Sequence, residues 1–417
     1  MMILRLSALK KIFMFVVLWL VAGLPARLVA QPQSTPIASA EWVGRYSQDR
    51  LAEITHAELQ NFLAGSTPGF EKFKGRFDSP RYAINLYKLR YLSVVPEMGN
   101  RPVMATGLVA IPETPEVQLP LISYQHGTVF EKKSVPSNPD QSMETRLMLS
   151  QFGGQGYIVI AADYFGLGDS ELNNSYFVRD STEQATFDFY TAAMKFVQEQ
   201  GKRVTHLTTM GWSQGGYSNM ILLRKLEREG IKVAASVTAA GAVDLSLFIT
   251  RGLTNPRPHE ASFQTAALSN MLFALERYRG VPGLARDAIR AEYFPTAAAF
   301  YEQKIDFSEF FRRVPKDPKR ALRPEFIQSL TLGTGPFAMI MDESASYKWL
   351  SQTPLRAYHG GQDEAVPDFI ARLAVDYQRI LGKTNGEAFS AGDDADHRAT
   401  YVYALIHAKP WLDQRVR

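Results

Sequence analysis

The sequence predicts an α/β protein with a doubly wound, mostly parallel sheet and a helical insertion. Three observations lead to this fold class. Predicted strands and helices alternate between residues 119 and 240, which is typical of a parallel sheet covered on both faces. One of these strands breaks sharply into a helix at Ser213, between two glycines. Residues 246–350 show no strand pattern, and the alternation resumes only after them.

Residues 1–30 have the order of a secretory signal peptide. Basic Arg5, Lys10 and Lys11 precede an apolar run of 13 residues over 12–24, and small residues follow up to Ala30. The run is short for a membrane span, so cleavage after Ala30 is expected to release a protein without a stable membrane span. An uncleaved N-terminal anchor is the alternative. The expected location is the periplasm or the extracellular space.

Charge and cysteine usage narrow the function classes. The chain has 46 Lys+Arg and 42 Asp+Glu, and residues 1–30 hold four of the basic side chains and no acidic ones. The mature chain therefore has 46 − 4 = 42 basic groups against 42 acidic groups, and no basic stripe suggests a nucleic-acid partner. The absence of cysteine excludes disulfides, thiolate catalysis and cysteine–zinc sites.

Residues 31–80 are predicted to form a leader and a helix. Gln31–Ala40 is polar and contains proline, which favours a flexible segment, and a helix is expected over Gln48–Leu63. Residues 81–245 form the first part of the predicted core. It opens with a hairpin of two strands, Tyr82–Val95 and Val103–Ile111, around turn-forming residues. The elements that follow are strands over Leu119–Gln125, Tyr157–Ala162, Val204–Met210 and Val233–Ala240, with helices over Ser142–Phe152, Thr182–Gln200 and Tyr217–Leu226.

Residues 246–350 are predicted to form a helical cap over the carboxyl edge of the sheet. The possible pocket-lining residues in it are Phe273, Phe311, Phe337, Met339 and Met341, although ordinary cap core is the simpler interpretation of each. Residues 351–417 complete the core. The elements expected there are a strand over Pro354–His359, a helix over Asp368–Leu381, a weak strand over Glu387–Ser390 and a helix over Arg398–His407.

The segment around Ser213 predicts a nucleophile elbow. Gly211-Trp212-Ser213-Gln214-Gly215 follows a β-branched strand and precedes an apolar helical pattern. Such a turn is so tight that side chains two residues before and after the serine would collide, which requires Gly211 and Gly215. The alternative is a tight loop with an inert serine.

A serine nucleophile needs a base, and the base needs an orienting acid that precedes it in the chain. His397 fits best, because it opens a helix after the last strand; His259, His359 and His407 are the other downstream histidines. Asp363 is the predicted acid, in a loop between a strand and a helix.

Other acidic residues compete with Asp363. Glu364 is its direct neighbour, and Asp393, Asp394 and Asp396 cluster too close to His397 in sequence to orient it. A solvated acidic loop is the simpler interpretation of this cluster. A calcium site is the alternative, but the spacing lacks the glycine and distal glutamate of an EF-hand loop, and no metal site is predicted.

Two backbone N–H groups are predicted to stabilise an oxyanion. Gln214 follows the serine, and Thr128 follows His126-Gly127 at the end of a strand, where glycine allows close approach. His126 precedes Ser213 and is interpreted as structural. The glycine-rich turn over Asp163–Ser170 is not a nucleotide-binding pattern and is also interpreted as structural.

Together these motifs resemble the α/β-hydrolase superfamily over roughly residues 80–410. Within it, the HGT turn, the Asp163-Tyr164-x-Gly166-Leu167-Gly168 segment, the W-S-Q-G-G elbow and the long insertion resemble secreted esterases and lipases of the secretory-lipase type. The chain departs from secretory lipases in lacking their cysteines. The resemblance implies hydrolysis of a small-molecule carboxylic ester through an acyl-enzyme, without a cofactor.

Three alternatives stay open. A serine aminopeptidase on the same fold would need a carboxylate or amide cluster for a free amine, for which Glu260, Glu276 and Glu309 are candidates. A non-catalytic binding protein that keeps the fold is the second. A structural or membrane-anchored protein, which would retain the N-terminal segment, is the third. The sequence does not indicate an oligomeric state.

Overall fold

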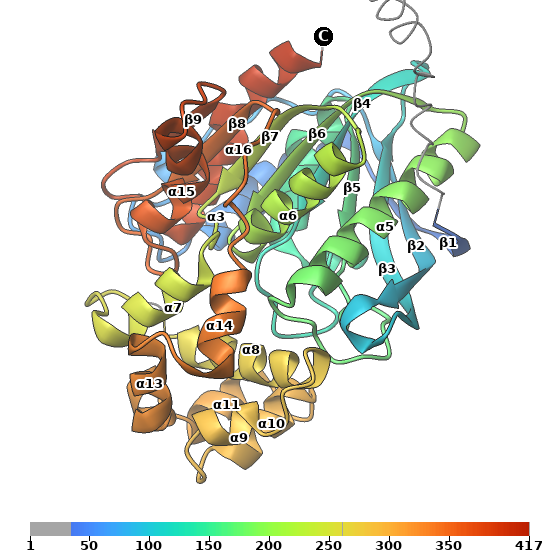
Figure 1. Ribbon diagram of the computed structural model, residues 1–417. Helices are drawn as coiled ribbons and strands as arrows, with labels where there is room; N and C mark the ends of the chain where they lie inside the picture. The colour runs from blue at the N-terminus through green and yellow to red at the C-terminus, as the bar shows by residue number, and fades with distance from the viewer. Residues whose placement is uncertain (1–34, 261, 417) are drawn as a thin grey trace, which may run out of the picture. The chain divides into compact units, whose positions relative to one another are not determined.

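The computed structural model describes residues 35–260 and 262–416, and its centre is a sheet. In the described part of the chain the sheet has nine strands in the order β1-β2-β3-β5-β4-β6-β7-β8-β9 (Figure 1). The strands are β1 (Ile37–Tyr46), β2 (Ile84–Val95), β3 (Arg101–Pro112), β4 (Gln118–Gln125), β5 (Ile158–Ala162), β6 (Arg203–Trp212), β7 (Val233–Ala239), β8 (Leu355–His359) and β9 (Gly386–Ser390). The pairings β1–β2, β2–β3 and β3–β5 are antiparallel, and the other five are parallel. The predicted fold class is confirmed.

Helices cover both faces of the sheet, and the strand pattern explains why. All five residues of β5 are buried, and successive side chains enter two different cores. Ile158, Ile160 and Ala162 belong to the core under α5 (Arg179–Glu199), α6 (Gln214–Arg228) and α15 (Asp368–Ile380). Val159 and Ala161 belong to the core under α4 (Met143–Gln151) and α16 (His397–Arg415). A strand buried on both faces is apolar throughout.

The remaining elements of the core are short. They are α2 (Gln48–Glu53), the π-helical η1 (Ile54–Glu58), α3 (Leu59–Phe62) and the 3₁₀ turns η2 (Phe70–Lys72), η3 (Pro96–Met98), η4 (Pro139–Gln141) and η5 (Gly153–Gln155).

Strand β1 was not expected from the sequence. The prediction of a flexible segment up to Ala40 is wrong from Ile37 onward, because β1 pairs with β2 along the edge of the sheet. Most of its side chains are exposed, including Trp42 and Val43. An edge strand with little burial carries no alternating apolar pattern, so the sequence gives it no strand signal.

The last helix is longer than predicted. Helix α16 runs to Arg415 rather than ending near His407, although Pro410 lies inside it. Trp411 and Leu412 beyond the proline are buried against the sheet, which compensates for the backbone hydrogen bond that proline cannot donate.

The helical insertion lies between β7 and β8 and forms one group of helices below the sheet in Figure 1. Its helices are α7 (Leu245–Thr254), α8 (Gln264–Tyr278), α9 (Leu284–Ala288), α10 (Phe294–Tyr301), α11 (Phe307–Arg313), α12 (Pro318–Ala321), α13 (Pro324–Thr331) and α14 (Gly335–Glu343). We call this group the cap.

The two chain segments that connect the cap to the core are tied to each other, and we call them the neck. Ser346 donates two hydrogen bonds to the carbonyl oxygen of Val243, from its N–H at 3.0 Å and from its hydroxyl at 3.2 Å. The Tyr347 hydroxyl donates to the Asp244 carboxylate at 3.0 Å. The entry and the exit of the cap are therefore held side by side.

The predicted signal segment lies outside the described residues. Within residues 35–260 and 262–416, no helix has a stretch that is long and apolar enough to span a bilayer.

Candidate active site

Ser213 lies at the sharp turn between β6 and α6. Its backbone has φ 59° and ψ −121°, a conformation that residues other than glycine rarely adopt. A Cβ added to Gly211 would lie 1.9 Å from the carbonyl oxygen of Gly215, and one added to Gly215 would lie 1.9 Å from that of Gln125. The two glycines are therefore required by close backbone contact. The turn holds the serine at the carboxyl edge of the sheet, as predicted for a nucleophile elbow.

Asp363 and His397 form a hydrogen-bonded pair. His397 Nδ1 lies 2.9 Å from Oδ1 and 3.0 Å from Oδ2 of Asp363. The carboxylate is fully buried, and its Oδ1 also accepts the N–H groups of Ala365 at 3.0 Å and Val366 at 2.7 Å. These two bonds fix the carboxylate in one orientation toward the ring.

The competing acids have other partners. Glu364 Oε2 accepts the backbone N–H of His397 at 3.0 Å and does not bond to its ring. Asp396 caps α16 by accepting the Ala399 N–H at 2.9 Å, and its other oxygen accepts the Thr67 N–H at 2.8 Å. Of these carboxylates, Asp363 is the one hydrogen-bonded to the imidazole.

The surroundings of His397 favour its charged form. Burial alone would lower the pKa of His397, but the charge and hydrogen bond of Asp363 act in the opposite direction. The charges of Glu364 and Asp396 add to this effect, and the pKa of the imidazole is raised overall. The protonated form of the His397 imidazole is thus stabilised.

His126 has a different environment, in agreement with a structural role. Its ring stacks on Tyr164 at 4.2 Å, and its two nitrogens lie 2.8 Å from the Gly127 carbonyl oxygen and 3.3 Å from that of Asp163. Burial lowers the pKa of His126 to about 4, so the ring is neutral at physiological pH.

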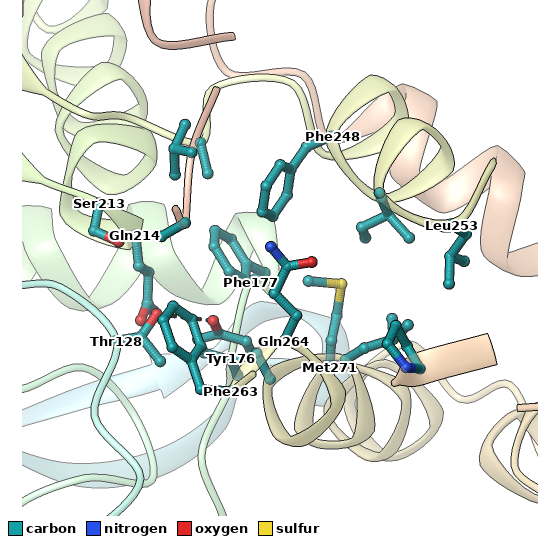
Figure 2. Close-up of a pocket in the computed structure, with 18 residues that line it drawn as sticks. Thr128, Tyr176, Phe177, Ser213, Gln214, Phe248, Leu253, Phe263, Gln264 and Met271 are labelled. Atoms are coloured by element: carbon teal, nitrogen blue, oxygen red, sulfur yellow. Dashed lines mark hydrogen bonds between the residues drawn. The ribbon is translucent and has the colours of Figure 1, made fainter. Parts of the chain in front are cut away.

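Two cavities meet at Ser213. The first is apolar, has an empty volume of about 630 Å³ including its mouth, and is drawn in Figure 2. Thr128, Ser213, Gln214 and Val366 line it from the core, and cap residues including Phe248, Ile249, Leu253, Phe263 and Met271 line it from the other side.

The second cavity is more polar and contains the histidine. Trp212, Ser213, Glu364, Asp396 and His397 are among the residues that line it. Ser213 and His397 therefore border the same space, although no hydrogen bond between their side chains is present among those of the described residues. Such contacts are often loose in enzymes without substrate.

The predicted oxyanion donors lie next to the serine. Thr128 and Gln214 both line the apolar cavity with Ser213 (Figure 2). Within the described part of the chain the Thr128 N–H has no hydrogen-bond partner. The Thr128 hydroxyl lies 2.8 Å from the Tyr176 hydroxyl, a contact for which the sequence gives no signal.

The cap residues named as possible pocket lining do not line the apolar cavity. Phe337 and Met341 are buried in the core, Phe273 and Phe311 are packed against it, and Met339 is 61% exposed. The four residues other than the exposed Met339 therefore belong to the packed interior of the cap, which was the simpler interpretation of each.

The cap glutamates each have partners. Glu260 bonds to Arg251 at 2.5 Å and to Arg257 at 3.2 Å. Glu309 is paired with two arginines, and Glu276 accepts the Ala285 N–H at 2.8 Å. None of these three glutamates lines the two cavities at Ser213.

Comparisons with known proteins agree with this architecture. A model of the prolyl oligopeptidase family matches residues 143–266, which is less than half of the chain. The search of curated protein sequences gives no match.

Solved structures extend the likeness to nearly the whole chain. A protein from Legionella pneumophila, named provisionally as a hydrolase, is 23% identical with a TM-score of 0.79, covering 91% of this chain and 98% of its own. A ligand-bound form of the rice cell wall degrading esterase LipA from Xanthomonas oryzae is 18% identical with a TM-score of 0.77, covering 91% and 98%. The chain has the α/β-hydrolase fold. The closed state of Candida antarctica lipase A is 15% identical with a TM-score of 0.66. The match covers 92% of this chain and 84% of that lipase. At these identities the likeness establishes the fold, and the reaction has to be argued from the site.

Proposed function

We propose that this chain is a serine hydrolase that cleaves carboxylic esters through Ser213, His397 and Asp363. The observation that carries the proposal is the hydrogen-bonded Asp363–His397 pair beside a serine held on an elbow, where an apolar cavity begins. A serine alone is a weak nucleophile, and a neighbouring base that is itself oriented by an acid activates it.

In the proposed reaction, Ser213 Oγ attacks the ester carbonyl while His397 Nε2 accepts the hydroxyl proton. The charged imidazole is stabilised by Asp363 and donates this proton to the leaving alcohol, which leaves an acyl-enzyme. Water then attacks the acyl-enzyme with His397 as the base, releasing the acid and restoring the serine. The N–H groups of Thr128 and Gln214 bind the oxyanion at both stages. The apolar cavity holds the acyl group.

A peptidase is the second candidate, because the prolyl oligopeptidase family model matches residues 143–266. An aminopeptidase needs a group that binds a free amine, and the three cap glutamates are paired elsewhere. The apolar lining beside Ser213 favours an ester with an apolar acyl group. The comparison of p-nitrophenyl esters with aminoacyl anilides separates the two activities.

The variant Ser213→Ala tests the nucleophile. Ester hydrolysis should fall by several orders of magnitude, about 10⁶-fold as for the corresponding loss in a serine protease, while the far-UV spectrum and melting temperature stay unchanged. A fluorophosphonate probe should label the wild type at Ser213 and leave the variant unlabelled. Residual activity within tenfold of wild type in folded protein would reject Ser213, and an unlabelled wild type would favour a non-catalytic binding protein.

A further inference from the structure

A second buried carboxylate lies beside the site and has no part in the proposed reaction. Glu144, in the first turn of α4, is only 7% exposed. Its two oxygens lie 3.2 and 3.0 Å from the N of Gly127, and Oε2 also accepts the Tyr124 hydroxyl at 2.8 Å. Burial raises the pKa of Glu144 to about 7. A buried acid is costly to keep without a task, so its contacts indicate what it does.

Glu144 and His126 hold the Gly127 backbone from its two ends. Glu144 accepts the Gly127 N–H, and the His126 ring lies 2.8 Å from the Gly127 carbonyl oxygen. The peptide that joins Gly127 to Thr128 is planar and trans, so the Thr128 N–H points away from that carbonyl oxygen. Fixing both ends of Gly127 therefore fixes the direction of the Thr128 N–H.

The loop is also packed closely against Glu144 and Trp212. A Cβ added to Gly127 would lie 3.3 Å from Glu144 Oε2 and 3.3 Å from the Trp212 ring. Trp212 in turn lies over His397, with ring centroids 4.9 Å apart, and stacks on Tyr401 at 4.7 Å. The Tyr401 hydroxyl donates to the backbone carbonyl of Glu144 at 2.8 Å. The glutamate thus belongs to a continuous network of contacts that reaches His397.

We propose that Glu144 is a positioning residue that holds the Gly127–Thr128 loop so that the Thr128 N–H faces the oxyanion. The inference rests on the proposed function, because it needs an oxyanion at Ser213. It predicts that loss of Glu144 weakens the stabilisation of the transition state rather than the binding of the substrate.

The test compares four variants of the full chain. Glu144→Ala removes the acceptor, and Glu144→Leu removes it while filling the space, in case the alanine variant does not fold. Glu144→Gln keeps an amide oxygen that can accept the Gly127 N–H. Tyr124→Phe is the matched control, because it deletes the other hydrogen bond to the same carboxylate and leaves the Gly127 contact in place.

Two readouts separate positioning from mere stability. The first is kcat and KM for a p-nitrophenyl ester, and the second is the rate of labelling by a fluorophosphonate, whose phosphoryl oxygen needs the same donors. Melting temperatures show that each variant is folded at the assay temperature. For Glu144→Ala and Glu144→Leu we expect kcat and the labelling rate to fall by about 10- to 100-fold, somewhat less than the loss of an oxyanion donor itself. KM should stay within about threefold, and Glu144→Gln should recover most of the rate.

The inference is overturned if Glu144→Ala or Glu144→Leu, folded at the assay temperature, loses no more kcat and labelling rate than Tyr124→Phe. It is also overturned if the whole loss appears in KM. These results leave the proposed function intact as long as the wild type is labelled at Ser213. Absence of labelling in the wild type would remove the proposed function, and the role of Glu144 with it.

Discussion

The three proposed catalytic residues follow strands of the core, whereas the apolar residues that face Ser213 come mainly from α7, α8 and their connection in the cap. On the core side, close backbone contacts place Ser213, main-chain N–H groups hold Asp363, and Asp363 in turn holds the His397 ring. On the cap side, contact is made by side chains such as Phe248 and Leu253, which fill space without directed bonds. We infer that the core determines the reaction and the cap determines which acyl group fits.

The largest effect expected from a change in the core, apart from loss of the serine, is that of Asp363→Asn. The amide keeps the geometry but favours the wrong histidine tautomer, and kcat/KM should fall by about 10⁴, as for the corresponding change in a serine protease. Glu364→Gln and Asp396→Asn should lose far less, because neither carboxylate bonds to the ring. The three variants are to be compared with one ester. If Asp396→Asn loses most and Asp363→Asn stays near wild type, the assignment of the acid is wrong.

A change in the cap should alter selectivity and leave the reaction in place. Leu253 lines the apolar cavity and lies at the far side from Ser213 in Figure 2. Leu253→Trp should therefore lower kcat/KM for p-nitrophenyl octanoate by roughly 10-fold or more and change that for the acetate little, since steric exclusion is worth about 1–3 kcal/mol. Leu332→Trp, on an exposed leucine of the cap, is the matched control. Equal losses for both esters would contradict a separate role of the cap.

The smallest expected effect is a shift of the pH profile. The charges of Glu364 and Asp396 contribute to the raised pKa of His397, after the larger effects of burial, which lowers it, and of Asp363. In the proposed reaction neutral His397 is the base, so activity should be lost as the pH falls through this pKa. Glu364→Gln should lower the pKa and move the acid limb of kcat/KM to lower pH, with little change on the plateau. A limb that moves to higher pH would show that the charge of Glu364 acts in the opposite sense.

The strands and the elbow of the core could be predicted because each is encoded by a short run of neighbouring residues. A buried strand such as β5 is apolar throughout, and the elbow requires glycine at 211 and 215, so neighbouring residues alone carry the information. The pairing of Asp363 with His397 follows from the order of strands in the sheet. The edge strand β1 was missed because its side chains are mostly exposed, and its position depends on β2 rather than on its own pattern.

The cavity and Glu144 were not predictable for a different reason. Phe248 lines the cavity and Phe300 is buried core, yet both are phenylalanines in helices of the cap. What distinguishes them is the contact between segments far apart in the chain. Glu144 likewise resembles any acidic residue in the first turn of a helix, and only the approach of Tyr124 and Gly127 gives it partners.

The neck has a consequence for how this molecule can change over evolutionary time. It joins the cap to the ends of β7 and β8, which are adjacent parallel strands, and Ser346 closes it by bonding to Val243. An insertion or deletion beyond these two points therefore leaves the spacing of the two strands unaltered. Relatives can therefore differ in the length of the segment beyond the neck while the pairing of β7 with β8 is kept.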